Sequence, residues 1–169
     1  MVKYVKEDTS VVFSEIPDEI TLAINISNCP HHCKGCHSPY LRKDIGDELT
    51  EEVLDKLIED NDGVTCVCFM GEGNDVEGII ALALHIKFKY LDKIKTALYF
   101  GGEEFYPTDY KLDSQLAFDY IKVGPYKEEC GPINKETTNQ RLYKIEKTQW
   151  SAISFVYKWV DITNKFWKK

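Results

Sequence analysis

Three closely spaced cysteines are the clearest sign of chemistry in this chain. Cys29, Cys33 and Cys36 are separated by three and by two residues, and they directly follow the apolar run 21–27. Iron–sulfur clusters of the four-iron type usually take four cysteine ligands. Three thiolates in one loop would therefore leave one iron free to bind another molecule, and this predicts a reactive cluster.

Zinc is the main alternative occupant of these thiols. A structural zinc site needs four nitrogen or sulfur ligands, often supplied as two separated pairs. Histidines of the same segment would complete such a set, namely His31, His32 and His37. A redox or inert role for the thiols is the remaining interpretation. The spacing favours the iron–sulfur cluster, because no second pair is placed to help hold zinc.

The other cysteines have the pattern of structural residues. Cys66 and Cys68 lie two apart in the strand-like run 63–69, so they would share one face. Residues on one face of a buried strand pack together, and free cysteines behave there as small hydrophobic side chains. We therefore expect both in the core. Cys130 stands alone in the sequence.

Length and composition restrict the kind of protein. The 169 residues predict a single domain, 1–169, that is large enough to form a core without disulfides. Residues 1–8 lack the apolar core of a signal peptide, so a reduced, cytoplasmic protein is expected. The longest apolar stretch, 79–86, is too short to span a membrane and predicts a buried helix. A net charge of −7 disfavours nucleic-acid binding and favours a small molecule or a protein as partner.

Alternating strand-like and helix-like segments predict an α/β fold with a parallel sheet. The expected strands are 20–26, 64–70, 94–100 and 118–123. The expected helices are 50–58, capped by a threonine, then 75–90, and a short helix after Pro107. In such sheets the ligand site lies beyond the carboxyl ends of the strands.

A second loop should meet the cysteines at that edge. Gly71-Glu72-Gly73 follows the second expected strand, as the cysteines follow the first. Glycines allow a close approach of the backbone to a ligand, and the carboxylate between them would hold a ligand ammonium group. A solvated acid in an ordinary turn is the alternative interpretation.

The spacing and position of the cysteines resemble those of the radical S-adenosylmethionine enzymes. This resemblance implies a partial (β/α) barrel of mostly parallel strands. It also implies a 4Fe-4S cluster whose open iron is chelated by S-adenosylmethionine. One electron from the cluster then breaks a sulfur–carbon bond and produces a 5′-deoxyadenosyl radical. No catalytic side chain is expected beyond the cluster and this cofactor.

Within that superfamily, the segment 29–37 looks most like the activating protein of anaerobic ribonucleoside-triphosphate reductase. Further similar segments are 97–102, 124–126, 138–141, 160–163 and 166–167. One departure lies at residue 70, where Met70 replaces the first glycine of the family's Gly-Gly-Glu or Gly-Gly-Asp motif. The aromatic segment 147–159, with Trp150, Phe155, Tyr157 and Trp159, is expected to be core or a docking surface.

The resemblance implies roles for individual residues and partners. Cys29, Cys33 and Cys36 would ligate the cluster, and Gly71, Glu72 and Asn74 would bind S-adenosylmethionine. The short chain would deliver the radical to a glycine of the partner reductase, with flavodoxin or ferredoxin as electron donor. Two alternatives stay open: a small-molecule radical enzyme, for example in deazapurine precursor synthesis, and a non-enzymatic zinc-binding adaptor. Residues 139–141 carry either a site role or a turn that satisfies backbone groups.

Overall fold

Four parallel strands form the centre of the fold. The computed structural model describes residues 1–91, 93–110, 112–149 and 155–167. The strands lie side by side in the order β3 (Thr21–Asn25), β5 (Cys66–Met70), β6 (Lys95–Tyr99) and β7 (Tyr120–Val123). They occupy the four segments predicted from the sequence. Their interiors are almost fully buried, which explains why they read as continuous apolar runs.

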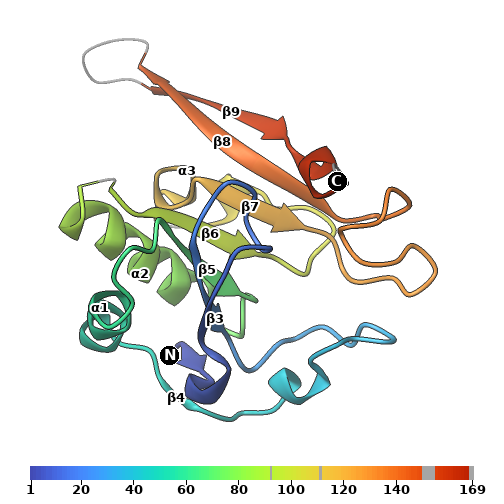
Figure 1. The fold of residues 1–169 in the computed structure, drawn as a ribbon, viewed down its shortest axis with the longest axis horizontal. Helices are drawn as coiled ribbons and strands as arrows, with labels where there is room; N and C mark the ends of the chain where they lie inside the picture. Colours follow the sequence, from blue (N-terminus) through green and yellow to red (C-terminus); the bar gives the residue numbers. More distant parts are fainter. Residues whose placement is uncertain (92, 111, 150–154, 168–169) are drawn as a thin grey trace.

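Three antiparallel strands extend this sheet to seven. The strand β2 (Ser10–Val12) pairs with β3 at one edge. A long hairpin of β8 (Arg141–Gln149) and β9 (Phe155–Asp161) extends the other edge beyond β7. The hairpin runs away from the body of the molecule (Figure 1). A separate pair, β1 (Lys3–Tyr4) with β4 (Asp47–Glu48), is also antiparallel. The sequence predicted none of these strands, and the partial-barrel closure stays a prediction.

Two helices, one amphipathic and one largely apolar, cover one face of the sheet (Figure 1). The first, α1 (Glu51–Glu59), begins at Thr50, whose side chain accepts a hydrogen bond of 3.3 Å from the Val53 backbone N–H. The second, α2 (Val76–Lys89), is capped by Asp75 and contains the predicted buried apolar stretch. Among the described residues, the other helical elements are a short helix, α3 (Ser114–Ala117), and the 3-10 turns η1 (Lys6–Asp8), η2 (Pro39–Arg42), η3 (Pro107–Asp109) and η4 (Thr163–Phe166).

The opposite face of the sheet is only partly covered. There Cys66 and Cys68 are fully buried and pack with Ile16 and Ile162 in a second, smaller core. Burial raises the pKa of both thiols well above the ordinary value. The prediction that these two cysteines share a buried face is therefore confirmed, and neither is available to a metal ion.

On this second face, the amino ends and the carboxyl ends of the parallel strands have different surroundings. Near the amino ends of the strands, the buried carboxylate of Glu19 accepts hydrogen bonds from Thr65 (2.6 Å), Tyr120 (2.8 Å) and Lys95. A buried carboxylate that accepts hydrogen bonds from three donors has its polar atoms satisfied, so these bonds hold it in position. The carboxyl ends of the parallel strands border a cavity.

The aromatic segment near the chain end belongs in part to the core. Tyr157 and Trp159 on β9 pack against the main core, and Trp159 lies 6.2 Å from the ring of Phe105. Phe155 is 44% exposed, and Trp150 lies outside the described residues. None of the described helices has the length and apolar character needed to cross a membrane.

Candidate metal centre

The cysteines lie in the loop that follows β3, and the two ends of this loop lie close together. We call residues 28–38 the cysteine loop. Its start is held by a hydrogen bond of 2.9 Å from the Cys29 backbone N–H to the carbonyl of Leu41. The 3-10 turn η2 lies at its return, where the Arg42 guanidinium donates to the carbonyl of Cys33 at 2.8 Å. Backbone and side-chain bonds together keep the loop at the carboxyl end of β3, as predicted.

All three loop cysteines are free, partly exposed and directed to one space. They line a cavity of about 800 Å³. Burial raises the pKa of Cys29, and the negative charges of Glu72, Cys33 and Cys36 raise it further. A positively charged metal would reverse that effect and hold the thiolate form. Within the described ranges, no three His, Cys, Asp or Glu side chains converge closely enough to hold a metal ion.

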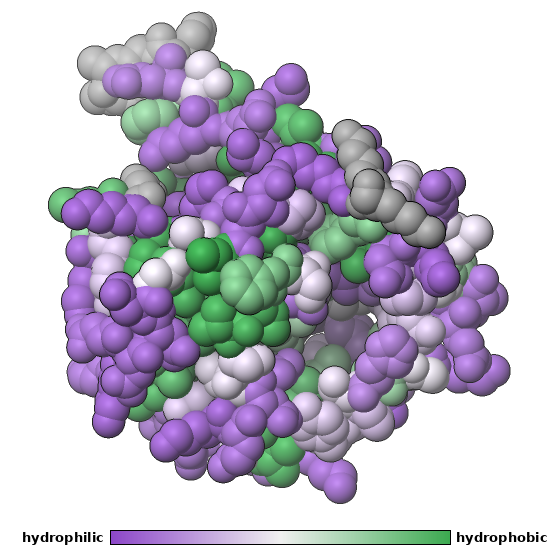
Figure 2. All heavy atoms as spheres, viewed as in Figure 1, coloured by the Kyte–Doolittle hydropathy of each residue, from purple (hydrophilic) through white to green (hydrophobic). Residues whose placement is uncertain are grey.

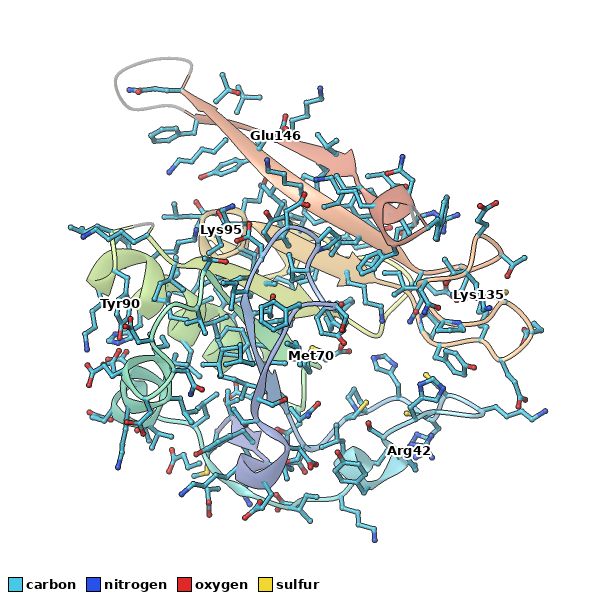
Figure 3. All side chains as sticks on the ribbon, viewed as in Figure 1. Arg42, Met70, Tyr90, Lys95, Lys135 and Glu146 are labelled. Atoms are coloured by element: carbon cyan, nitrogen blue, oxygen red, sulfur yellow. The ribbon has the colours of Figure 1, made fainter. Side chains whose placement is uncertain are left out.

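Several parts of the chain line the cavity, among them Lys165 and Phe166 of η4. Figure 2 shows the molecule hollowed on this face. In Figure 3, Met70 lies at the end of β5, and Arg42 lies across the hollow from it. The cysteine loop with Arg42 forms one wall, the segment 13–17 forms another, and the loop 124–140 contributes a third. The carboxyl ends of the parallel strands form the floor.

Four residues in one row make up that floor. Asn25 pairs with Met70 across β3 and β5, and Tyr99 pairs with Lys122 across β6 and β7. The register between β5 and β6 places Met70 and Tyr99 level with each other. We call Asn25, Met70, Tyr99 and Lys122 the floor row. All four line the cavity.

Lys122 is the charged member of the floor row. Its ammonium lies 5.1 Å from the centre of the Tyr99 ring. Burial lowers the pKa of Lys122 to about 8, although the acidic groups around it, Cys68, Cys33, Glu15 and Glu72, act in the opposite direction. The ammonium is therefore mostly charged near neutral pH, although it lies at the buried floor of the cavity.

The turn after β5 meets the cysteine loop, as the sequence predicted. Glu72 is only 5% exposed and lines the cavity together with Gly71. One of its carboxylate oxygens bonds the ring of His31, and the other accepts a hydrogen bond of 2.6 Å from the Gly101 backbone N–H. Glu72 therefore links the cysteine loop to the turn after β6. A ligand ammonium would have to share this carboxylate with two groups of the protein.

The neighbouring glycines permit that packing. Gly71 has a φ of +123°, a conformation that side chains disfavour. At Gly101, an added Cβ would lie 2.3 Å from the His31 ring, so only glycine lets the histidine reach Glu72. Asn74 is exposed and lies outside the cavity lining. The contacts predicted for Gly71, Glu72 and Asn74 with S-adenosylmethionine stay predictions.

The loop 124–140 covers the outer side of the cysteine loop. Tyr126 lies 5.2 Å from the His37 ring, measured between ring centres, and Lys34 forms an ion pair of 3.2 Å with Glu128. In the same region, Asn139 and Gln140 donate to the carbonyls of Pro125 (2.9 Å) and Gly124 (3.2 Å).

Residues 139–141 therefore act as a turn that satisfies backbone groups, one of the two interpretations drawn from the sequence. Arg141 donates to the carbonyls of Thr138 and Gln140, at 2.8 Å each. Gln140 also lines the cavity, although its amide is already bonded to Gly124. Cys130 is partly exposed and does not line the cavity.

The donor set of the cavity fits a 4Fe-4S cluster. Cys29, Cys33 and Cys36 supply three sulfur ligands and would hold the cluster, while Cys66 and Cys68 are too deeply buried to supply a fourth. The buried Nε of Arg42 has no hydrogen-bond partner among the described residues. An N–H donor of this kind beside the cysteine loop suits the sulfur atoms of a cluster, because hydrogen bonds to sulfur stabilise such centres.

Several residues that line the cavity were not predicted from the sequence to be part of the site, namely Glu15, Asn25, Arg42, Tyr99, Lys122 and Tyr126. Tyr99 and Tyr126 lie in the segments 97–102 and 124–126, which resemble the family but carried no predicted role. A further local signal was Lys122 itself, because a charged residue is unusual inside a buried apolar strand. The others come together only through strand register and loop packing.

Comparison with known proteins supports the metal assignment. A family described as a 4Fe-4S single cluster domain matches residues 20–145. No curated protein and no solved structure matches the chain. The matched range contains the three loop cysteines, the four parallel strands and the whole floor row. The chain therefore belongs to the family of 4Fe-4S single cluster domains.

Proposed function

We propose that this protein is a radical S-adenosylmethionine enzyme that activates an anaerobic ribonucleotide reductase. The observation that carries the proposal is the shared cavity, in which three cysteines face the glycine-containing turn after β5 and the floor row. Its volume, about 800 Å³, falls within the range of about 300–1,000 Å³ typical of small-molecule sites. A space of this size supports the proposal that a cluster and a second molecule would be bound together.

The bound cluster would donate one electron to S-adenosylmethionine, giving methionine and a 5′-deoxyadenosyl radical that takes a hydrogen atom from a glycine. Flavodoxin or ferredoxin would then return the electron. The residues of this chain have three tasks in that reaction. The loop cysteines hold the iron, Arg42 fixes the loop through the Cys33 carbonyl, and the floor row closes the cavity from below.

The cavity rim supports a protein as the final target. Phe13 lines the rim and is 74% exposed. Phe166 and Ile133 also line the cavity and pack against the second core. Exposed aromatic side chains are among those that contribute most to binding when a partner protein covers them. A glycine carried on a loop of the reductase would enter past these side chains.

The decisive experiment follows one hydrogen atom. The reconstituted protein is mixed anaerobically with the reductase, S-adenosylmethionine and a reductant, after the reductase has been labelled with deuterated glycine. The proposal predicts deuterium in 5′-deoxyadenosine and a radical on the reductase. A matched sample with unlabelled glycine should show a doublet in electron paramagnetic resonance, since the remaining α-hydrogen splits the signal.

Other outcomes identify the alternatives. Deuterium that arrives from a labelled small molecule, with no radical on the reductase, would indicate a small-molecule radical enzyme. A colourless protein that binds zinc and does not cleave S-adenosylmethionine would indicate an adaptor. Either result would overturn the proposed function.

A further inference from the structure

The outer edge of the sheet, at β9, has backbone groups that point away from the neighbouring strand. β9 is the last strand in the sheet order and lies at the outer border of the molecule (Figure 1). At its base, the Ile162 backbone N–H donates to the carbonyl of Leu142 at 2.9 Å. Hydrogen-bonded and non-bonded residue pairs alternate along an antiparallel ladder. Counted from this bond, Tyr157 and Trp159 belong to non-bonded pairs, so their N–H and C=O groups point away from β8.

The other side of the hairpin shows the same alternation. Ile145 pairs with Trp159, and its backbone N–H donates to the carbonyl of Asp119 at 2.7 Å, on the side of β7. The corresponding groups of Trp159 therefore point to the free edge. Within the described ranges, no backbone hydrogen bond outside the strand ladders involves Tyr157 or Trp159.

The distal half of the hairpin consists of two strands only. β7 pairs with residues 141–144, so the part of β8 beyond Ile145 pairs with β9 alone. A two-stranded ribbon is marginally stable in water. In this half, Phe155 and Val156 are 44% and 51% exposed. Apart from Lys158, β9 lacks the features that usually protect an edge strand, since it contains no proline and pairs with β8 without a bulge. The edge is therefore suited to accept a further strand.

The charge of the hairpin indicates which strand fits. The strands β8 and β9 together contain four basic and two acidic residues, a net charge of +2, whereas the whole chain has a net charge of −7. Two copies of this chain paired through β9 would bring two positive hairpins together, and a pairing centred on Lys158 would place this residue opposite itself. A strand that contains Asp and Glu residues complements the positive hairpin.

The free edge also leads toward the cavity. β9 ends at Asp161, and η4 follows directly. Lys165 and Phe166 of η4 line the cavity. A segment that pairs with β9 and continues beyond the carboxyl end of this strand therefore comes to the cavity wall.

We propose that the free edge of β9 binds an extended, acidic segment of the partner protein as an eighth strand of the sheet. The inference rests on the proposed function, in which the partner is the reductase, and it names the surface on which the reductase docks. Main-chain hydrogen bonds to Tyr157 and Trp159 hold the added strand, and Lys158 favours its acidic side chains. The polypeptide next to the added strand then enters the cavity.

Amide hydrogen exchange tests for the added strand directly. Exchange of single amides is followed by mass spectrometry with fragmentation, on the anaerobic, reconstituted protein alone and in the presence of the reductase. The amides of Tyr157 and Trp159 should exchange about tenfold more slowly in the complex, because they gain hydrogen-bond partners. The amides of Lys158 and Val160 belong to bonded pairs with β8 and should change less.

A matched pair of charge reversals tests the acidic character of the segment. Lys158→Glu should weaken binding of the reductase about fivefold, and more at low than at high salt, because an attraction becomes a repulsion. Lys56→Glu makes the same change at an exposed position of α1 and should leave binding within about twofold of wild type. Neither lysine lines the cavity. Both variants should therefore cleave S-adenosylmethionine at the wild-type rate when the reductase is absent.

Three results would overturn the inference. If the reductase acquires its radical but the amides of Tyr157 and Trp159 slow no more than their neighbours, the docking surface is wrong and the proposed function stands. If these amides are already protected in a dimer of the protein alone, detected by analytical ultracentrifugation, the added strand comes from a second copy. If the reductase neither binds nor acquires a radical, the proposed function fails and the inference with it.

Discussion

Replacing Lys122 by methionine should make the empty protein more stable. Burial lowers the Lys122 pKa from 10.5 to about 8, which corresponds to about 3 kcal/mol of stability lost while the group is charged. Methionine has a similar length and no charge to bury. The variant loses the contact with the Tyr99 ring, worth about 0.5–1 kcal/mol. The net gain near pH 7 is therefore about 2 kcal/mol, or roughly 4–8 °C in melting temperature for a chain of this size.

The gain should depend on pH in a defined direction. Below about pH 8 the lysine is charged in both the folded and the unfolded wild-type protein, so the full cost is present. Between about 8 and 10.5 the folded protein loses this proton while the unfolded chain keeps it, so wild-type stability rises with pH. The advantage of Lys122→Met should therefore shrink across this window. The groups that act on Lys122 are Cys68, Cys33, Glu15 and Glu72, and they are the same in both proteins.

Urea unfolding of the reduced, metal-free proteins measures this difference at each pH. Far-UV circular dichroism follows the transition, and Lys165→Met is the control, with an expected change within about 0.5 kcal/mol. A Lys122→Met protein that is less stable than wild type at pH 7, by an amount that does not change with pH, would refute the reasoning. That result would show that the Lys122 ammonium stabilises the folded protein instead of lowering its stability.

The remaining predictions concern the cysteine loop. Alanine at any one loop cysteine should abolish stable iron binding, measured as iron per protein after anaerobic reconstitution. The control, Cys68→Ala, should keep its iron because that thiol is fully buried. Equal losses of iron would contradict the ligand assignment. Glu72→Ala should remove the bond to the His31 ring and reduce iron retention. It should also lower the affinity for S-adenosylmethionine about tenfold. Glu104→Ala is the control, because Glu104 is exposed. Gly101→Ala should lower iron retention in the same way, since its Cβ would collide with His31; an unchanged iron content would show that this contact does not position the loop.

Local patterns were sufficient to predict the central strands and the main helices. Four apolar runs became β3, β5, β6 and β7, and Thr50 caps α1 as its type and position suggested. These features depend on residues close together in the sequence. The β8–β9 hairpin was missed because only Leu142 and Ile145 of β8 are buried, and its stability comes from pairing between strands rather than from an apolar run.

The candidate site was only partly predictable for the same reason. The cysteines and the turn at Gly71 and Glu72 follow neighbouring parallel strands, so their meeting could be inferred from strand order alone. The floor row needs the register of four strands, which no short pattern specifies. The bonds of Glu72 to His31 and Gly101 join three loops, and the sequence offered only the expectation that this carboxylate would face a ligand.

The central claim is that three cysteines hold a 4Fe-4S cluster whose fourth iron is open to a molecule in the cavity. Mössbauer spectroscopy of protein reconstituted with ⁵⁷Fe, recorded with and without S-adenosylmethionine, tests this claim directly. We expect one of the four irons to change its isomer shift when S-adenosylmethionine is added, while the other three stay the same. Four irons that do not respond would show that a fourth protein ligand closes the cluster, and they would contradict the account.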